Sequence, residues 1–142
     1  MSKVIIIAVG KLKDKSIILL LEEYVKRLGP YIKLEIKEIK DEGKLKESEK
    51  ILNFIDENTF ILDATGKNYT SEEFSEFLKK NQEKGDIKFI IGGPEGFTNE
   101  VRQKSKAISL SKMTFTHEMT RMLLLEQIYR AKMIEKGKPY HK

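Results

Sequence analysis

A chain of 142 residues with 39% hydrophobic content is long enough for one core, so we expect a single domain over residues 1–142. The absence of cysteine excludes disulfides, thiolate metal sites and a cysteine nucleophile. Net charge is +5, and residues 100–142 hold 10 basic and 4 acidic side chains, whereas the first 99 residues hold 17 and 18. This placement favours an anionic partner such as nucleic acid, with a lysine-rich solvated surface as the alternative.

The first third of the chain reads as strand, helix, strand. Residues 4–9 are apolar and β-branched, which predicts a strand buried on both faces near the centre of a parallel sheet. This stretch is too short to span a membrane and has no signal-peptide cleavage pattern, so we expect a cytoplasmic protein. Apolar residues at helical spacing over 17–28 predict an amphipathic helix. Alternation over residues 31–38 predicts an edge strand with one wet face.

The middle of the chain continues the alternation of strands and helices. Residues 41–50 are highly charged and predict a loop and then a solvated helix face. Residues 60–63 predict a short strand, and residues 64–67 predict the loop after it. Thr70 and Glu73 have the spacing of a capping box, which starts the next helix. Another buried strand is predicted over residues 88–91.

This last strand stops abruptly at a glycine-rich turn, residues 92–96. Glycine has no side chain to hold a ligand away, so backbone N–H groups of this turn can approach a bound molecule. A helix start at Thr98 completes a strand, glycine loop and helix, the place where open α/β sheets bind ligands. A tight connection without a ligand is an equally good interpretation. The turn fails the dinucleotide pattern G-x-G-x-x-G, and Gly66-Lys67 fails the P-loop pattern.

The last third contains a short strand at residues 107–110, a hydroxyl-rich connection at 109–116 and a long helix at 117–135. The connection is either ordinary or the second wall of a pocket opposite residues 92–96. The helix is more apolar than one buried stripe requires, which predicts a homodimer. His117 and His141, the only histidines, are too far apart in the sequence to suggest a metal site, so we expect no metal. Capping and packing are favoured for His117, whereas a Pro-Tyr-His-Lys terminus favours a function for His141.

Four separated motifs together resemble the RlmH family of SPOUT RNA methyltransferases. They are Ile91–Gly96, Leu110–His117 with the nearby Arg121, Leu125–Ala131, and the terminal Pro139–Lys142. Residues 8–13 and 26–31 are similar to that family as well, so the resemblance covers the chain essentially from end to end. It implies an α/β fold with a mainly parallel sheet, helices on both faces and a C-terminal trefoil knot. Without the resemblance, the pattern predicts an unknotted doubly wound sheet, because knots are rare.

The resemblance also implies an activity and its partners. A homodimer would transfer a methyl group from S-adenosylmethionine to N3 of a pseudouridine, number 1915, in helix 69 of 23S rRNA, within the assembled ribosome. No metal is implied. A non-catalytic ribosome-binding or assembly factor is the alternative from another class, and a general nucleotide binder is the third.

The resemblance also implies which residues form the site. The cofactor contacts of the family map onto three loops, at Leu62, Gly92, Leu110, Ser111, Lys112, Met113, Thr114 and Phe115. We assign Tyr140 and His141 to catalysis at the rRNA end of the site, and Arg121 and Lys142 to holding phosphate or the developing anion. Two departures from the family stand out, namely a short region at residues 41–50 and an acidic residue, Glu118, where a neutral one is expected.

Overall fold

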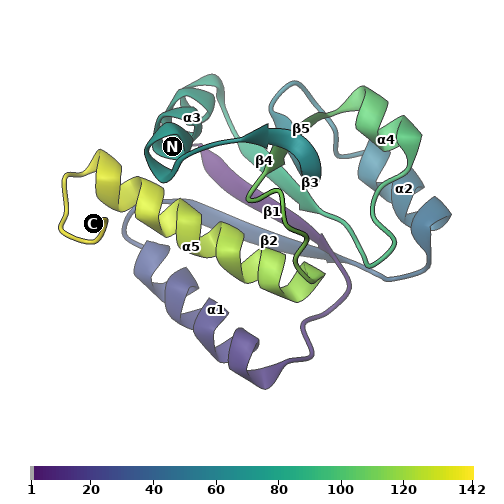
Figure 1. The fold of residues 1–142 in the computed structure, drawn as a ribbon, viewed down its shortest axis with the longest axis horizontal. Coiled ribbons are helices and arrows are strands. Elements are labelled where there is room, and N and C mark those ends of the chain that lie inside the picture. The colour runs from purple at the N-terminus through teal and green to yellow at the C-terminus, as the bar shows by residue number, and fades with distance from the viewer. Residues whose placement is uncertain (1) are drawn as a thin grey trace.

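Five strands form one parallel sheet at the centre of the molecule (Figure 1). The computed structural model describes residues 2–142. The strands are β1 (Lys3–Val9), β2 (Lys33–Ile39), β3 (Thr59–Asn68), β4 (Ile87–Ile91) and β5 (Lys106–Ser109). Their order is β2-β1-β4-β3-β5, and every neighbouring pair is parallel. The predicted edge position of the second strand and the inner position of the first are therefore confirmed.

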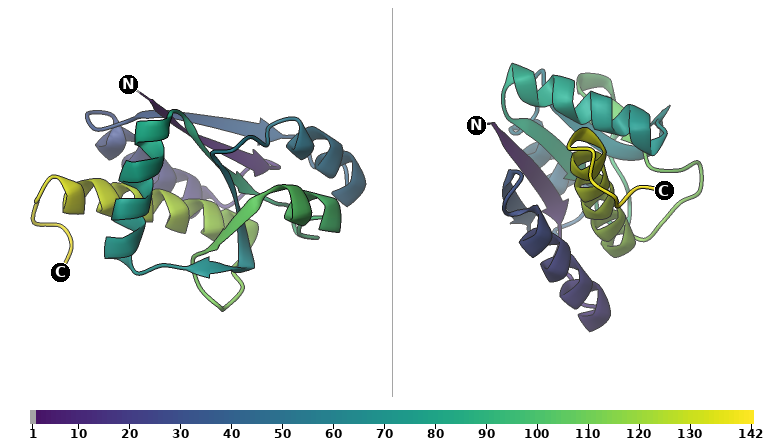
Figure 2. Two further views of the ribbon diagram at one scale, coloured as in Figure 1. Left: turned by 90° about the horizontal axis from the view of Figure 1, so that it is seen from above. Right: turned by 90° about the vertical axis from the view of Figure 1, so that its left-hand side faces the viewer.

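Helices cover both faces of the sheet. They are α1 (Lys15–Leu28), α2 (Lys44–Leu52), α3 (Ser71–Lys84), α4 (Asn99–Lys104) and α5 (His117–Glu135). Helices α1, α3 and α5 share one core cluster, whereas α2 and α4 belong to the cluster on the other face. Figure 2 shows α5 nearly end-on between α1 and α3 in its right-hand view. The predicted α/β class with a mainly parallel sheet is confirmed.

Strand β1 shows why the sheet is covered twice. Its six residues from Val4 to Val9 are all buried. Val4, Ile6 and Ala8 belong to the core beneath α1, α3 and α5, and the residues between them belong to the core beneath α2 and α4. Because successive side chains of a strand point to opposite faces, a continuous apolar run needs a cover on each side.

Helix ends follow from local side chains. Thr70 accepts from the Glu73 N–H at 3.1 Å, and the Glu73 carboxylate accepts from the Thr70 N–H at 2.8 Å. This confirms the predicted capping box. Asp14 caps α1, and Thr116 caps α5 by accepting from the Met119 N–H at 3.2 Å. The predicted bounds of the last helix, 117–135, are confirmed.

Two expectations for the middle of the chain need correction. Residues 64–67 are part of β3 rather than a loop, because the strand continues past a register shift between Leu62 and Lys67 in its pairing with β5. Gly66 permits this, since a Cβ there would lie 2.6–2.8 Å from backbone atoms of residues 107 and 108. Helix α2 is also less solvated than its charge suggested, because Glu47, Ser48 and Ile51 are buried.

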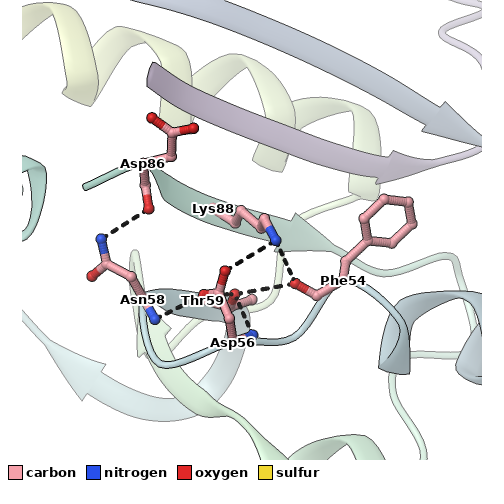
Figure 3. A network of polar contacts seen from close by, with 6 residues as sticks. All are labelled: Phe54, Asp56, Asn58, Thr59, Asp86 and Lys88. Atoms are coloured by element: carbon pink, nitrogen blue, oxygen red, sulfur yellow. Dashed lines mark hydrogen bonds and ion pairs between the residues drawn. The ribbon is translucent and has the colours of Figure 1, made fainter. Parts of the chain in front are cut away.

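A polar network joins the amino ends of β3 and β4 (Figure 3). The Lys88 ammonium donates to the Phe54 carbonyl at 2.9 Å and to the Asp56 carboxylate at 3.1 Å. Asp56 also accepts from the Thr59 hydroxyl and the Asn58 N–H, both at 2.8 Å. Burial raises the pKa of Asp56, but these hydrogen bonds outweigh it and hold that pKa below its ordinary value. The network stabilises the end of the sheet where β3 and β4 begin, whereas the candidate site lies at the end where β4 stops.

The C-terminal trefoil knot stays a prediction, because strand order and pairing do not describe how the chain threads. Within residues 2–142, no helix combines the length and the apolar character needed to cross a membrane.

Candidate functional site

A cavity of about 910 Å³ opens at the carboxyl end of β4, beside the middle of β3 and the first turns of α5. Three segments that are far apart in the sequence line it: residues 62–64 of β3, the glycine loop at residues 92–97 and the segment 109–116. Ligand pockets usually measure roughly 300–1,000 Å³, so this cavity can enclose a ligand the size of a nucleoside.

Seven of the eight residues assigned to the methyl donor line this cavity. They are Leu62, Gly92, Leu110, Ser111, Met113, Thr114 and Phe115. Lys112 is exposed and is not among the lining residues. The structure therefore brings the three predicted segments together, whereas binding of the donor by these residues stays a prediction.

The glycine loop follows directly from β4 and folds back on itself. The Gly96 N–H donates to the Gly93 carbonyl at 3.0 Å, and Gly96 has a φ of 75°, which favours glycine. Phe97 is buried, and a Cβ on Gly92 would lie 3.1 Å from its ring. Glycine at position 92 thus lets the backbone lie against this ring while its other side borders the cavity.

Arg102 of α4 links two of the three segments that line the cavity. Its guanidinium donates to the Asp63 carboxylate at 3.3 Å and to the Phe97 carbonyl at 2.8 Å. Asp63 also accepts from the Thr65 hydroxyl. Burial raises the pKa of Asp63, but the hydrogen bonds from Thr65 and Arg102 outweigh it and lower that pKa, so the carboxylate stays charged. The middle of β3 and the glycine loop are therefore held together by one side chain.

The segment 109–116 is ordered by its own hydroxyl groups. The Ser109 hydroxyl donates to the Ser111 carbonyl at 2.6 Å, and the Ser111 hydroxyl accepts from the Met113 N–H at 3.0 Å. These bonds form a turn that leaves Met113 76% exposed and Phe115 38% exposed. Two large apolar side chains at the rim of a cavity are available to pack on a ligand.

A smaller cavity of about 230 Å³ adjoins the first. The two share Ser109, Leu110 and Phe115, and the smaller one extends toward the start of α3. Phe115 thus borders both spaces.

Arg121 lies beneath the site rather than in it. Its side chain is 3% exposed, and its guanidinium donates to the Glu38 carboxylate at 2.7 Å and to the Gly10 carbonyl at 3.0 Å. Sequence spacing on α5 could not reveal this partner, because Glu38 is 83 residues away. A contact between Arg121 and a substrate stays a prediction, and it would require this buried ion pair to open.

The two residues assigned to catalysis are held against α5 by the returning C-terminal tail. The Tyr140 hydroxyl lies 2.8 Å from the Glu126 carboxylate and 2.9 Å from the Tyr24 hydroxyl. Nδ1 of His141 lies 3.0 Å from the Arg130 guanidinium, and Nε2 lies 3.1 Å from the Glu72 carboxylate. Arginine can only donate, so Nδ1 accepts and Nε2 carries the proton that Glu72 accepts. Lys142 is exposed at the end of the tail.

Neither Tyr140 nor His141 lines either cavity of its own chain. In Figure 1 the tail lies at the left end of α5, whereas the first turn of α5 is at the right end. Thr120 is the last residue of α5 that lines the larger cavity. The tail is anchored at Glu126 and Arg130, which lie about 9–15 Å farther along the helix axis. The structure thus does not bring the catalytic pair to the cofactor residues of the same chain.

Sequence reasoning missed several cavity residues. Asp14, Ile17 and Asp63 line the cavity, and His117, for which packing was favoured, does as well. Glu118, which the resemblance had placed beside the site, also lines it. Asp63 carries a sequence signal, since it follows Leu62 in the same strand. Asp14 carries none, because its proximity arises only from packing of α5 against the start of α1. Among residues 2–142, no group of three or more histidine, aspartate or glutamate side chains could hold a metal ion.

Comparison with known proteins gives the family. The family described as "Predicted SPOUT methyltransferase" matches residues 2–141. The chain belongs to the SPOUT methyltransferase family. Curated relatives named "Ribosomal RNA large subunit methyltransferase H" are similar to it as well. The relative from Desulfitobacterium hafniense strain Y51 is 41% identical, with 100% of both chains covered. The relative from Clostridium novyi strain NT is 44% identical, with 96% of this chain and 98% of the relative covered.

These findings confirm the resemblance to SPOUT methyltransferases. The fold agrees with this family, because the mainly parallel sheet carries the cavity at the carboxyl end of β4. Ligands of open α/β sheets characteristically bind at this edge.

Proposed function

We propose that the chain transfers a methyl group from S-adenosylmethionine to N3 of pseudouridine 1915 in helix 69 of 23S rRNA, acting as a homodimer on the assembled ribosome. The observation that carries the proposal is the single cavity formed by Leu62, the glycine loop and the segment 109–116 in a SPOUT methyltransferase. Action on ribosomes would also agree with the cytoplasmic location expected from the sequence.

The cavity suits the methyl donor in size and chemistry. Its walls combine apolar side chains, such as Leu62 and Phe115, with backbone groups of the glycine loop. Apolar walls with a few polar groups are typical of sites that bind an adenine ring and an amino-acid group together. When bound, S-adenosylmethionine supplies a methyl group on a positively charged sulfur. We assign its binding to the eight residues named from the resemblance, with Lys112 at the rim.

An RNA substrate is supported by the relatives and by charge. The relatives that align over the full chain are named for methylation of large-subunit ribosomal RNA. The balance of 10 basic against 4 acidic residues from residue 100 onward favours a phosphate-rich partner.

Transfer to N3 requires that this nitrogen lose its proton. Burial, followed by hydrogen bonding to Tyr24 and Glu126, raises the pKa of Tyr140, so its phenol stays protonated and can donate a hydrogen bond. This leaves the imidazole of His141 as the group of the tail that can accept the N3 proton, at Nδ1, once that nitrogen leaves the Arg130 guanidinium. Lys142 would hold a nearby phosphate, and Arg121 would stabilise the anion from beneath if its ion pair opens. Positioning of N3, the methyl carbon and the positively charged sulfur in line would supply much of the rate, as the N–C bond forms and the S–C bond breaks.

The experiment that tests this proposal is transfer of a tritiated methyl group to ribosomes that lack the modification, followed by mapping of the labelled base. We expect label at N3 of the pseudouridine in helix 69 and none on ribosomes that already carry it. Label at another base would contradict the substrate assignment. Binding to ribosomes without binding of S-adenosylmethionine in calorimetry would instead support the alternative, a non-catalytic ribosome-binding or assembly factor.

A further inference from the structure

The connection between β1 and α1, residues 10–14, lies beside the cavity and is not explained by methyl transfer. Together with the first residue of α1, it carries three exposed lysines, Lys11, Lys13 and Lys15. Leu12 between them packs against the core beneath α5. Asp14 lines the cavity and caps α1 by accepting from the Ser16 N–H at 2.9 Å. The lysines are thus presented to solvent at the mouth of the candidate site.

Helix α5 holds this connection at both ends. Arg121 donates to the Gly10 carbonyl at 3.0 Å, where β1 ends. Glu118 accepts from the N–H of Lys13 at 2.8 Å and from the N–H of Asp14 at 3.1 Å. In Figure 1 the connection accordingly runs alongside the first turn of α5. The conformation of the lysine-bearing segment is therefore coupled to the helix that forms one wall of the cavity.

The side chains of these three lysines also lack protein partners. Within residues 2–142, none of the three forms an ion pair or donates a side-chain hydrogen bond. Several lysines elsewhere are paired, for example Lys50 with Glu42 at 2.7 Å and Lys88 with Asp56 at 3.1 Å. Two carboxylates that contact the segment, Asp14 and Glu118, accept from backbone N–H groups rather than from these lysines. Three lysines therefore stand against these two carboxylates, and their ammonium groups stay unpaired.

We infer that Lys11, Lys13 and Lys15 bind backbone phosphates of the RNA substrate at the mouth of the cavity, and that Glu118 is a positioning residue that presents them. This inference rests on the proposed function, because it takes the partner to be RNA. Phosphates attract lysines irrespective of sequence, so the segment would align the substrate without selecting a base. This role would explain why an acidic residue occupies position 118, where the resemblance leads us to expect a neutral one.

The test replaces the three lysines together, in the full-length protein, with alanine. The matched control is K79A/K80A/K84A, which removes three exposed lysines from α3 and changes net charge equally. Binding to ribosomes that lack the modification is measured over a range of salt concentrations. We expect the K11A/K13A/K15A variant to bind ribosomes about tenfold more weakly, whereas the control changes little. The slope of log affinity against log salt concentration should also become shallower by about 2–3 in this variant. Calorimetry should give unchanged affinity for S-adenosylmethionine in both.

Glu118 is tested by a variant for which charge and positioning predict opposite results. E118A removes a negative charge, so a purely electrostatic role predicts tighter binding of ribosomes. Loss of the hydrogen bonds to Lys13 and Asp14 predicts weaker binding instead, by several-fold, and this is the result that we expect. E118Q keeps an acceptor oxygen and should restore most of the affinity.

The outcomes separate this inference from the proposed function. If wild type methylates ribosomes but K11A/K13A/K15A binds them like the α3 control, the phosphate-binding role is wrong and the proposed function stands. If wild type neither binds nor methylates ribosomes, both are wrong. Tighter binding by E118A would overturn the positioning role alone.

Discussion

At the scale of single residues, the cavity depends on a few side chains that no local pattern identifies. Arg102 donates hydrogen bonds to Asp63 in β3 and to Phe97 in the glycine loop, so it sets the distance between two walls of the cavity. Gly66 has an analogous effect on β3 and β5, because only a residue without a side chain fits against the backbone of β5 at that point. Both residues support the site without touching the place where chemistry would occur.

Replacing Arg102 with alanine should weaken binding of S-adenosylmethionine by about tenfold, or about 1.4 kcal/mol, because the glycine loop loses its preorganisation. Isothermal titration calorimetry measures this directly. The matched control is K104A, which removes an exposed ion pair with Glu100 on the same helix and should change the affinity by less than about twofold. Equal losses of affinity in the two variants would show that the positive charge of α4, rather than the link from Arg102 to Asp63, supports binding of S-adenosylmethionine.

Replacing Gly66 with alanine should lower the free energy of unfolding by about 1–3 kcal/mol, because the new Cβ would lie within 2.8 Å of β5 backbone atoms. Urea unfolding followed by circular dichroism measures the change. Gly29 supplies the control, since it has helical backbone angles and a Cβ there would meet only the Lys26 carbonyl at 3.3 Å. G29A should change stability by less than about 1 kcal/mol. A stable G66A protein would contradict the steric explanation of β3.

At the scale of elements, helix α2 is packed beneath the glycine loop through a buried carboxyl. Glu47 is 4% exposed and accepts from the Gly43 N–H at 3.1 Å. A Cβ on Gly93 would lie 3.0 Å from its other oxygen, so this carboxyl lies directly against the loop. Burial, followed by the neighbouring Asp41, raises the pKa of Glu47 above the ordinary glutamate value. Contact between α2 and the loop is therefore sensitive to the proton on one side chain.

This raised pKa predicts a pH dependence of stability with a definite sign. The folded chain binds the Glu47 proton more tightly than the unfolded chain, so the contribution of Glu47 is favourable below the ordinary glutamate pKa and is lost as pH rises through the folded value. E47Q keeps a neutral side chain of the same shape, and it should therefore equal or exceed wild type in stability at neutral pH. The advantage should shrink in acid. Urea unfolding at several pH values measures both, and a less stable E47Q protein at neutral pH would refute the assignment.

At the scale of the whole molecule, the two parts of the predicted site lie on opposite stretches of α5. The cofactor residues surround its first turns, whereas Tyr140 and His141 are anchored at Glu126 and Arg130. A homodimer resolves this separation if the tail of one subunit reaches the cavity of the other. Exposed apolar side chains on α1, with Leu19 69% and Leu20 49% exposed, offer a surface that a second subunit could cover.

Mixing two inactive variants tests this arrangement. One variant, Y140A/H141A, lacks the tail groups, and the other, G92V, has a displaced glycine loop, because its side chain would press on the buried Phe97 ring. In a mixed dimer the intact tail of the second variant would serve the intact cavity of the first, so random mixing should restore about a quarter of the sites. Methyl transfer to ribosomes after subunit exchange is the measurement. If each tail serves its own cavity, no mixture of these two variants regains activity.

The sequence by itself determined the class of fold, the start and end of α5, the capping box of α3 and the three segments that line the cavity. These features depend on local patterns or on motifs whose residues are close together in the chain. Tertiary structure alone decided that residues 64–67 extend β3, that Arg121 pairs with Glu38, and that Glu118 holds the segment before α1. Each depends on contacts between residues 41–105 positions apart, which are created when strands pair and helices pack on the sheet and which leave no periodic signal in the sequence.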